Sequence, residues 1–269
     1  ASNIYYRRGT PDAGRTSYTW SAALTVSAAS YDNIPDLGAH AEGTGWKAHV
    51  VWSYNPGGPY DAKYQRIDIT SGGTISLDGS LVTLGSYTGT AHTYPSISVD
   101  SSKNLYVTWA TGATGAGKGV RFKKATYSAG PTWTWGSEDT VIDTVYALAM
   151  GPNVLDSTGR VIVVFRDSGG SSYLRVFRRS TGGVWSDISP TTLVGQNPTL
   201  GVDANNNLYL VYANSGLFYR KYNGTTWESA VTIDTDTTAT YPSARRDSAG
   251  SAIDVVYTTG SGSPYTVKS

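Results

Sequence analysis

The chain has 269 residues, a formal net charge of +1, no cysteine, and charged side chains at only 15% of its positions. These values exclude a disulfide framework, thiol catalysis and cysteine-based zinc sites, and they argue against nucleic acid as a partner. No apolar stretch approaches the ~18 residues of a membrane helix, so we expect no membrane insertion. Since soluble domains usually contain about 25% charged residues, the surface is expected to be rich in Ser, Thr, Asn, Gly and Tyr, as in extracellular proteins.

The first thirty residues contain one strand pattern, Asn3–Arg8, and one turn motif. Asp12, Gly14 and Thr16, followed by Trp20, resemble the Asp-box of the sialidase-like, BNR-repeat propellers. In that motif, Asp and Thr cap a tight turn, Gly supplies a positive φ, and Trp fills the gap between blades. The resemblance implies a β-propeller fold and gives these four residues a structural role.

Four landmarks then recur along the chain with a period of about 50 residues. Each unit has an opening dipeptide, a strand that ends near Asp, an apolar strand that ends in an aromatic residue, and a basic-aromatic strand that in most units leads to a Trp-bearing corner. Such a period with about four strands per unit is typical of β-propellers. The opening dipeptides are Ile34-Pro35, Tyr94-Pro95, Tyr146-Ala147, Asn197-Pro198 and Tyr241-Pro242.

The repeats predict an all-β chain that forms a single β-propeller domain over residues 1–269, with five four-stranded blades. A six-bladed ring is the alternative. Strands from both termini are expected to close the ring, because closure removes exposed sheet edges. Ser263–Ser269 also fits a strand of the last blade, and it could pair with a second subunit instead. The predicted blades are approximately 34–90, 94–143, 145–194, 197–238, and 241–269 together with 1–30.

The loops that lead into the inner strands converge on one face of a propeller, over its central channel, where ligands usually bind. The residues there are aromatic and amide side chains with few charges. Tyrosine faces stack on sugar rings, and amides bracket hydroxyl pairs, so this face is expected to bind a neutral glycan without catalysis. The predicted ligand-binding residues are Tyr31, Asn33, His92, Tyr94, Tyr146, Arg166, Gln196, Asn197 and Tyr241.

Two other functions are alternatives to this lectin-like prediction. A glycoside-cleaving enzyme would need two carboxylates across the sugar, and Asp32, Asp143 and Asp167 are the candidates. Sialidase activity is not expected, because Asn33-Ile34-Pro35 stands where the resembled family has an Arg-Ile-Pro segment. The other alternative is a structural subunit of a surface assembly that exchanges a terminal strand. Neither a metal nor a cofactor is expected.

We expect an extracellular or surface location for the protein. The chain starts at Ala1 rather than Met, which is typical of a processed mature chain or an excised domain.

Overall fold

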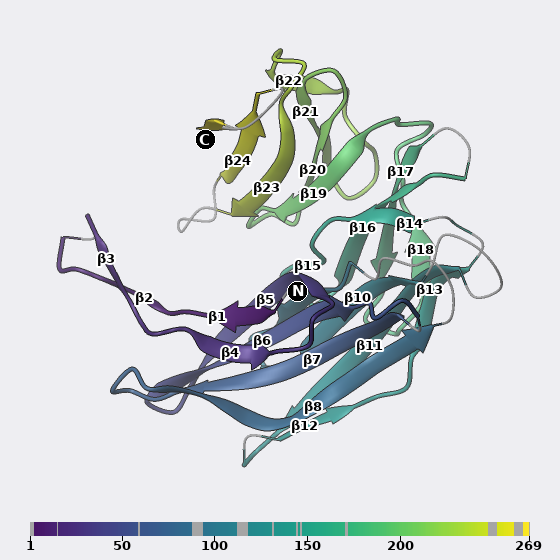
Figure 1. The fold of residues 1–269 in the computed structure, drawn as a ribbon. Coiled ribbons are helices and arrows are strands. Elements are labelled where there is room, and N and C mark those ends of the chain that lie inside the picture. The colour runs from purple at the N-terminus through teal and green to yellow at the C-terminus, as the bar shows by residue number, and fades with distance from the viewer. Residues whose placement is uncertain are drawn as a thin grey trace.

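The computed structural model describes residues 3–14, 16–58, 60–87, 94–111, 118–130, 132–143, 145, 147–169, 172–246, 252–260 and 266–268. Every regular element in these ranges is a β-strand (Figure 1). None of the described ranges therefore contains a helix long and apolar enough to span a membrane. The 20 Tyr and 8 Trp residues favour this outcome, since aromatic side chains suit a pleated, half-buried surface.

Five antiparallel sheets follow one another along the chain, and each is built from consecutive strands. The first contains β5 (Asp32–Glu42), β6 (Gly45–Tyr54), β7 (Tyr60–Ile69) and β8 (Ile75–Tyr87). The second contains β9 (Ser96–Val99), β10 (Leu105–Thr111), β11 (Gly119–Ser128), β12 (Thr132–Trp135) and β13 (Asp139–Asp143). The third contains β14 (Ala147–Met150), β15 (Val154–Leu155), β16 (Val161–Asp167), β17 (Tyr173–Arg179) and β18 (Trp185–Asp187). The fourth contains β19 (Gln196–Val202), β20 (Leu208–Ala213), β21 (Leu217–Tyr222) and β22 (Val231–Asp234), and the fifth contains β23 (Thr240–Arg246), β24 (Ile253–Thr259) and β25 (Thr266–Lys268).

The architecture is that of a β-propeller, as the repeats predict. Neighbouring sheets lie face to face, and the apolar core forms between them. Central strands such as β10 are buried along their whole length, so they appear in the sequence as nearly continuous apolar runs. Four core clusters each combine residues of successive sheets: Val51 and Trp109 share one cluster, Phe122 and Phe165 a second, Leu174 and Leu210 a third, and Val211 and Tyr257 a fourth.

Corner tryptophans connect the second, third and fourth sheets to the sheet before each of them. The indole N–H of Trp133 donates to the backbone oxygen of Lys103 at 2.7 Å, and its ring packs against His49 of the first sheet. Trp185 and Trp227 likewise donate to Asp139 and Ile188 of the preceding sheets. These corners therefore have the packing role that the repeat pattern predicts.

Hydrogen bonds also join successive inner strands around the channel. Asp36 of β5 accepts a hydrogen bond from the Ser96 hydroxyl at 2.8 Å. The same hydroxyl oxygen accepts from the backbone N–H of Asn153 at 2.8 Å. Further along, Thr199 accepts from the backbone N–H of Ala244 at 3.3 Å. These contacts fix the spacing of the inner strands and thus the shape of the space that they enclose.

The two termini contribute to different sheets. β1 (Ile4–Tyr6) pairs with β4 (Leu24–Ser27), and this small sheet packs on Trp52 of the first sheet. The hairpin of β2 (Gly9–Pro11) and β3 (Tyr18–Trp20) extends outward from it (Figure 1). β25 pairs with β24 of its own chain. Among the described strand pairings none joins the termini in one sheet, and closure of the ring by both termini stays a prediction.

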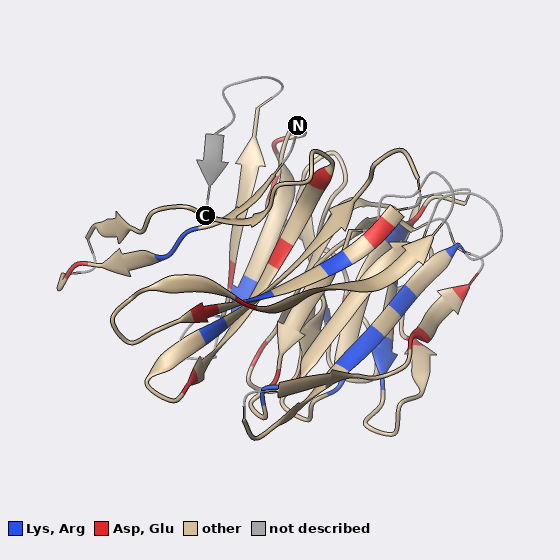
Figure 2. Ribbon diagram, turned by 60° about the horizontal axis from the view of Figure 1, so that its bottom comes forward, with Lys and Arg blue, Asp and Glu red and all other residues tan. Residues whose placement is uncertain are grey.

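Charged residues are interspersed along the strands rather than gathered by sign. Figure 2 shows basic and acidic positions scattered over the sheets. This distribution agrees with the net charge of +1. Strong local charge is therefore expected in small clusters of residues rather than over a whole face.

Candidate functional site

The residue before the opening proline has an unusual backbone conformation in four of the five sheets. Its φ angle is 51° at Ile34, 36° at Tyr94, 46° at Asn197 and 48° at Tyr241. Positive φ is uncommon outside glycine, and a following proline restricts the backbone further. A register shift marks the same point in three sheets, between Asn33 and Asp36, Gln196 and Thr199, and Thr240 and Ser243. Such bulges re-aim side chains, here at the start of each inner strand.

Three of these positive-φ residues meet at a cavity of about 250 Å³. Tyr94, Asn197 and Tyr241 line it, together with Pro198, Pro242 and the segment 149–152. We call this end of the channel the opening end. The Asn197 amide donates to the Thr240 hydroxyl at 2.7 Å, which ties the fourth sheet to the fifth beside the cavity. The structure thus brings together three of the predicted ligand-binding residues.

The two tyrosines differ in their environment. Tyr241 is 68% exposed, so its ring is available at the rim. Burial raises the pKa of the Tyr94 hydroxyl, and the positive charge of Arg166 acts against this rise. Arg166 therefore lies within electrostatic reach of Tyr94. The Nε of Arg166 is buried and has no hydrogen-bond partner in the described part of the chain.

The other predicted ligand-binding residues do not line this cavity. Tyr31 is exposed, Gln196 is exposed at the start of β19, and the buried Oδ1 of Asn33 lacks a described partner. His92 and Tyr146 lie outside the described residues. The site is therefore narrower than the one that the sequence predicts.

The three candidate catalytic carboxylates each bind a different partner. Asp32 is 1% exposed and accepts the indole N–H of Trp52 at 2.7 Å. Asp143 forms an ion pair with Arg121 at 2.7 Å. Asp167 lies 3.9 Å from Arg175. None of the three lines the opening-end cavity, and no group of three potential metal ligands occurs among the described residues.

The Asp-box segment forms a capped turn on the outlying hairpin. Asp12 accepts hydrogen bonds from the Thr16 N–H and hydroxyl, both at 2.8 Å, and these bonds lower its pKa to about 2. Trp20 is 61% exposed, so the expectation that it fills a gap between blades is wrong. Gly14 does not adopt the expected positive φ either. The reason for the Trp20 result is that β3, which carries it, belongs to a hairpin that extends away from the sheets (Figure 1).

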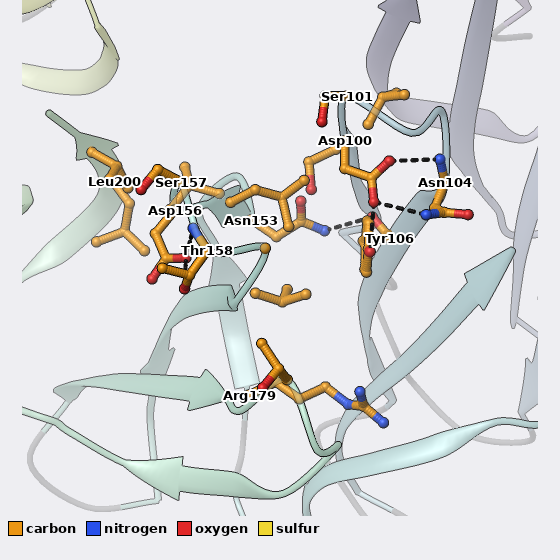
Figure 3. A pocket seen from close by; sticks show the side chains of 18 of the residues that line it. Asp100, Ser101, Asn104, Tyr106, Asn153, Asp156, Ser157, Thr158, Arg179 and Leu200 are labelled. Carbon is orange, nitrogen blue, oxygen red and sulfur yellow. Dashed lines mark hydrogen bonds between the residues drawn. The ribbon is translucent and has the colours of Figure 1, made fainter. Parts of the chain in front are cut away.

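A larger cavity of about 770 Å³ lies at the opposite end of the inner strands. We call this the turn end, because the β9–β10 and β15–β16 turns border it (Figure 3). In both turns one Asp caps the backbone: Asp100 accepts from the Asn104 N–H at 2.8 Å, and Asp156 accepts from the Arg160 N–H at 3.0 Å. Asp203 holds the β19–β20 turn in the same way through Asn207, at 2.9 Å. The sequence shows Asp at each of these strand ends, but it gave no indication of the cavity.

Comparison by sequence finds no relative, since no family model and no curated protein matches the chain. Solved structures do resemble it. A protein of unknown function from Dyadobacter fermentans DSM 18053 is 16% identical, with a TM-score of 0.60 over 93% of this chain and 79% of that one. AofleA from Arthrobotrys oligospora is 11% identical, with a TM-score of 0.61 over 94% and 72%. A catalytically inactive virginiamycin B lyase from Staphylococcus aureus is 12% identical, with a TM-score of 0.53 over 98% and 74%.

At such low identities the likeness establishes the fold alone. It supports the β-propeller architecture, which these neighbours share. The finer resemblance to Asp-box propellers stays a prediction, because no family model supports it.

Proposed function

We propose that this chain is an extracellular, non-catalytic carbohydrate-recognising propeller that binds a neutral glycan at its opening end. The observation that carries the proposal is the convergence of Tyr94, Asn197 and Tyr241 on one cavity. They come from three different repeats, and each has the same rare backbone conformation. Residues held in such conformations cluster at ligand sites.

The chemistry of this cavity suits a sugar. A tyrosine ring offers a flat apolar face to C–H groups, and an amide both donates to and accepts from hydroxyl groups. The exposed ring of Tyr241 would stack on the sugar, while the Asn197 carbonyl oxygen would accept a hydroxyl proton.

The dimensions limit what can enter. Drug-sized ligands usually occupy cavities of about 300–1,000 Å³, and this cavity has about 250 Å³. It therefore suits one terminal sugar of a glycan, with the rest of the chain outside. Hydrolysis receives no support here, because Asp32, Asp143 and Asp167 do not line the cavity.

A glycan array followed by calorimetry tests the proposal. We expect binding of at least one neutral glycan, and Tyr241→Ala should weaken it by about tenfold, the effect of removing one stacking anchor. Tyr18→Ala is the matched control, because Tyr18 is 57% exposed but lies on the outlying hairpin. An array with no neutral glycan bound, or an equal loss in Tyr18→Ala, would reject the proposal.

A further inference from the structure

We propose a second binding site at the turn end, for a ligand that carries a carboxylate beside several hydroxyl groups, such as a hexuronate. Its cavity is about 770 Å³, within the usual range of about 300–1,000 Å³ for small-molecule sites. Residues of the second, third, fourth and fifth sheets line it. The inference does not depend on the neutral-glycan site, since the two cavities share no lining residue.

The carboxylates at the rim are already occupied. Asp100 accepts from the backbone N–H of Asn104 at 2.8 Å, from the Asn104 amide at 2.8 Å and from the Tyr106 hydroxyl at 2.8 Å. Asp156 accepts from Thr158 and from Arg160, with which it also forms an ion pair. Figure 3 shows the contacts of Asp100 with Asn104 and Tyr106 and the contact of Asp156 with Thr158. Neither carboxylate is therefore free to bind an incoming cation.

The basic side chains at the same cavity are less occupied. The cavity is lined by four basic residues, Lys124, Arg179, Arg245 and Arg246. Among the described residues that line it, the only two carboxylates are those of Asp100 and Asp156, which already accept hydrogen bonds within the protein. Arg179 pairs with Asp139 at 3.1 Å, and the Lys124 ammonium lies 5.2 Å from the centre of the Tyr106 ring. The backbones of Arg245 and Arg246 pair with β24, but in the described part of the chain no hydrogen bond or ion pair engages either side chain. The cavity thus has unpaired positive charge, which favours an anion.

Two buried polar atoms indicate hydroxyl groups in the same ligand. Asn153 is only 2% exposed, and its amide nitrogen donates to Ser96 and Tyr106 backbone oxygens, both at 3.0 Å. This orientation fixes its Oδ1 as an acceptor, and that atom has no partner among the described residues. The hydroxyl of Ser98 is also unpartnered there. Both residues line the cavity, and Asn153 lies between the two turns (Figure 3).

A buried polar group without a hydrogen-bond partner is unfavourable. A hydroxyl donor for Asn153 and a hydroxyl partner for Ser98 would remove this cost. A carboxylate alone could bind the arginines and accept from the Ser98 hydroxyl, but it has no proton to donate to Asn153 Oδ1, whereas a neutral sugar has no negative charge for the arginines. A sugar acid satisfies both sets at once, and this combination selects the ligand class.

Isothermal titration calorimetry with three probes, D-glucuronate, D-glucose and inorganic phosphate, tests the site at matched ionic strength. We expect D-glucuronate to bind at least tenfold more tightly than either of the others. Arg245→Gln and Arg246→Gln should each weaken D-glucuronate binding about threefold, and the double variant about tenfold, as exposed ion pairs allow. Arg7→Gln is the matched control, since Arg7 is exposed and lies outside both cavities.

The outcomes separate this site from the proposed neutral-glycan site. Tyr241→Ala should leave D-glucuronate affinity unchanged, and the arginine double variant should leave neutral-glycan affinity unchanged. Equal affinity for D-glucuronate and phosphate would overturn the recognition of hydroxyl groups. Equal affinity for D-glucuronate and D-glucose, or unchanged binding in the double variant with an intact thermal transition, would overturn the anion site.

Discussion

The indole N–H of Trp52 donates to the carboxylate of Asp32 across 2.7 Å, and both side chains are almost completely inaccessible to solvent. The bond joins the start of β5 to the middle strand of the first sheet. Trp52 also packs against Ile4 and Val26, which come from the N-terminal strands. Asp32 thus supports the contact between the N-terminal strands and the first sheet.

Asp32→Ala should therefore destabilise the fold. Removing the acceptor leaves a buried indole N–H without a partner, and we expect the free energy of unfolding to fall by about 1–3 kcal/mol. Asp32→Asn keeps an acceptor oxygen and should cost less. Urea denaturation measures both. A fully stable Asp32→Ala protein that had lost a glycosidase activity would instead identify Asp32 as catalytic.

Trp133→Ala should lower stability by about 3 kcal/mol while leaving glycan binding unchanged. The ring packs against His49 and Tyr127, each with centroids 5.0 Å away, and the Arg66 guanidinium lies 4.7 Å from it. Truncation creates a cavity between the first and second sheets, for which such a cost is typical. Trp133→Phe should retain part of the packing but lose the hydrogen bond to Lys103, so its cost should be smaller.

The contrast with Tyr94→Ala makes this prediction specific. Tyr94 lines the opening-end cavity, so its truncation should weaken neutral-glycan binding and leave the melting temperature nearly unchanged. A pair of variants with the reverse behaviour would mean that the ligand face is assigned to the wrong end of the sheets.

The repeats make the fold predictable because each blade is a local unit. Strand periodicity, the Asp at the end of the inner strand and the Trp at the corner all act within about 50 residues, so one copy supports the next. The same logic places Tyr94, Asn197 and Tyr241 at one end of the channel, since they occupy equivalent positions.

What the sequence does not reveal depends on contacts between distant segments. From the sequence, Asp32 is a candidate catalytic acid. Only the structure shows that it is buried and accepts a hydrogen bond from the Trp52 indole. Trp20 matches a motif, but its exposure depends on where the hairpin extends. Unsatisfied atoms such as Asn153 Oδ1 have no sequence pattern, because they arise only from the final packing of neighbouring sheets.

Ile34→Asn should stabilise the protein or leave its stability unchanged. Ile34 has φ of 51°, a conformation that is a clear outlier for a β-branched residue. Left-handed backbone costs about 1–2 kcal/mol for most residues and less for asparagine. Since Ile34 is partly exposed, little packing is lost. We expect the melting temperature of Ile34→Asn to rise or stay the same. Ile97→Asn is the contrasting variant: because Ile97 is buried, this substitution should lower the melting temperature. A fall in the melting temperature of Ile34→Asn would show that this backbone is not strained.

The buried His49 should make stability depend on pH above the range in which carboxylates titrate. Burial lowers its pKa to about 3, and the positive charges of His40, Arg66 and Lys47 act in the same direction. The Tyr64 hydroxyl lies 2.9 Å from its Nδ1.

In the unfolded chain, histidine has a pKa of about 6.5, so the unfolded state binds one more proton between pH 6.5 and 3. The free energy of unfolding should therefore fall as the pH decreases across this window, by up to about 1.4 kcal/mol per pH unit. His49→Gln should remove this slope between pH 6.5 and 4.5, whereas His40→Gln should retain it. Urea denaturation at several pH values checks both variants, and a flat profile for the unsubstituted protein above pH 4.5 would show that His49 is accessible to protons in the folded state.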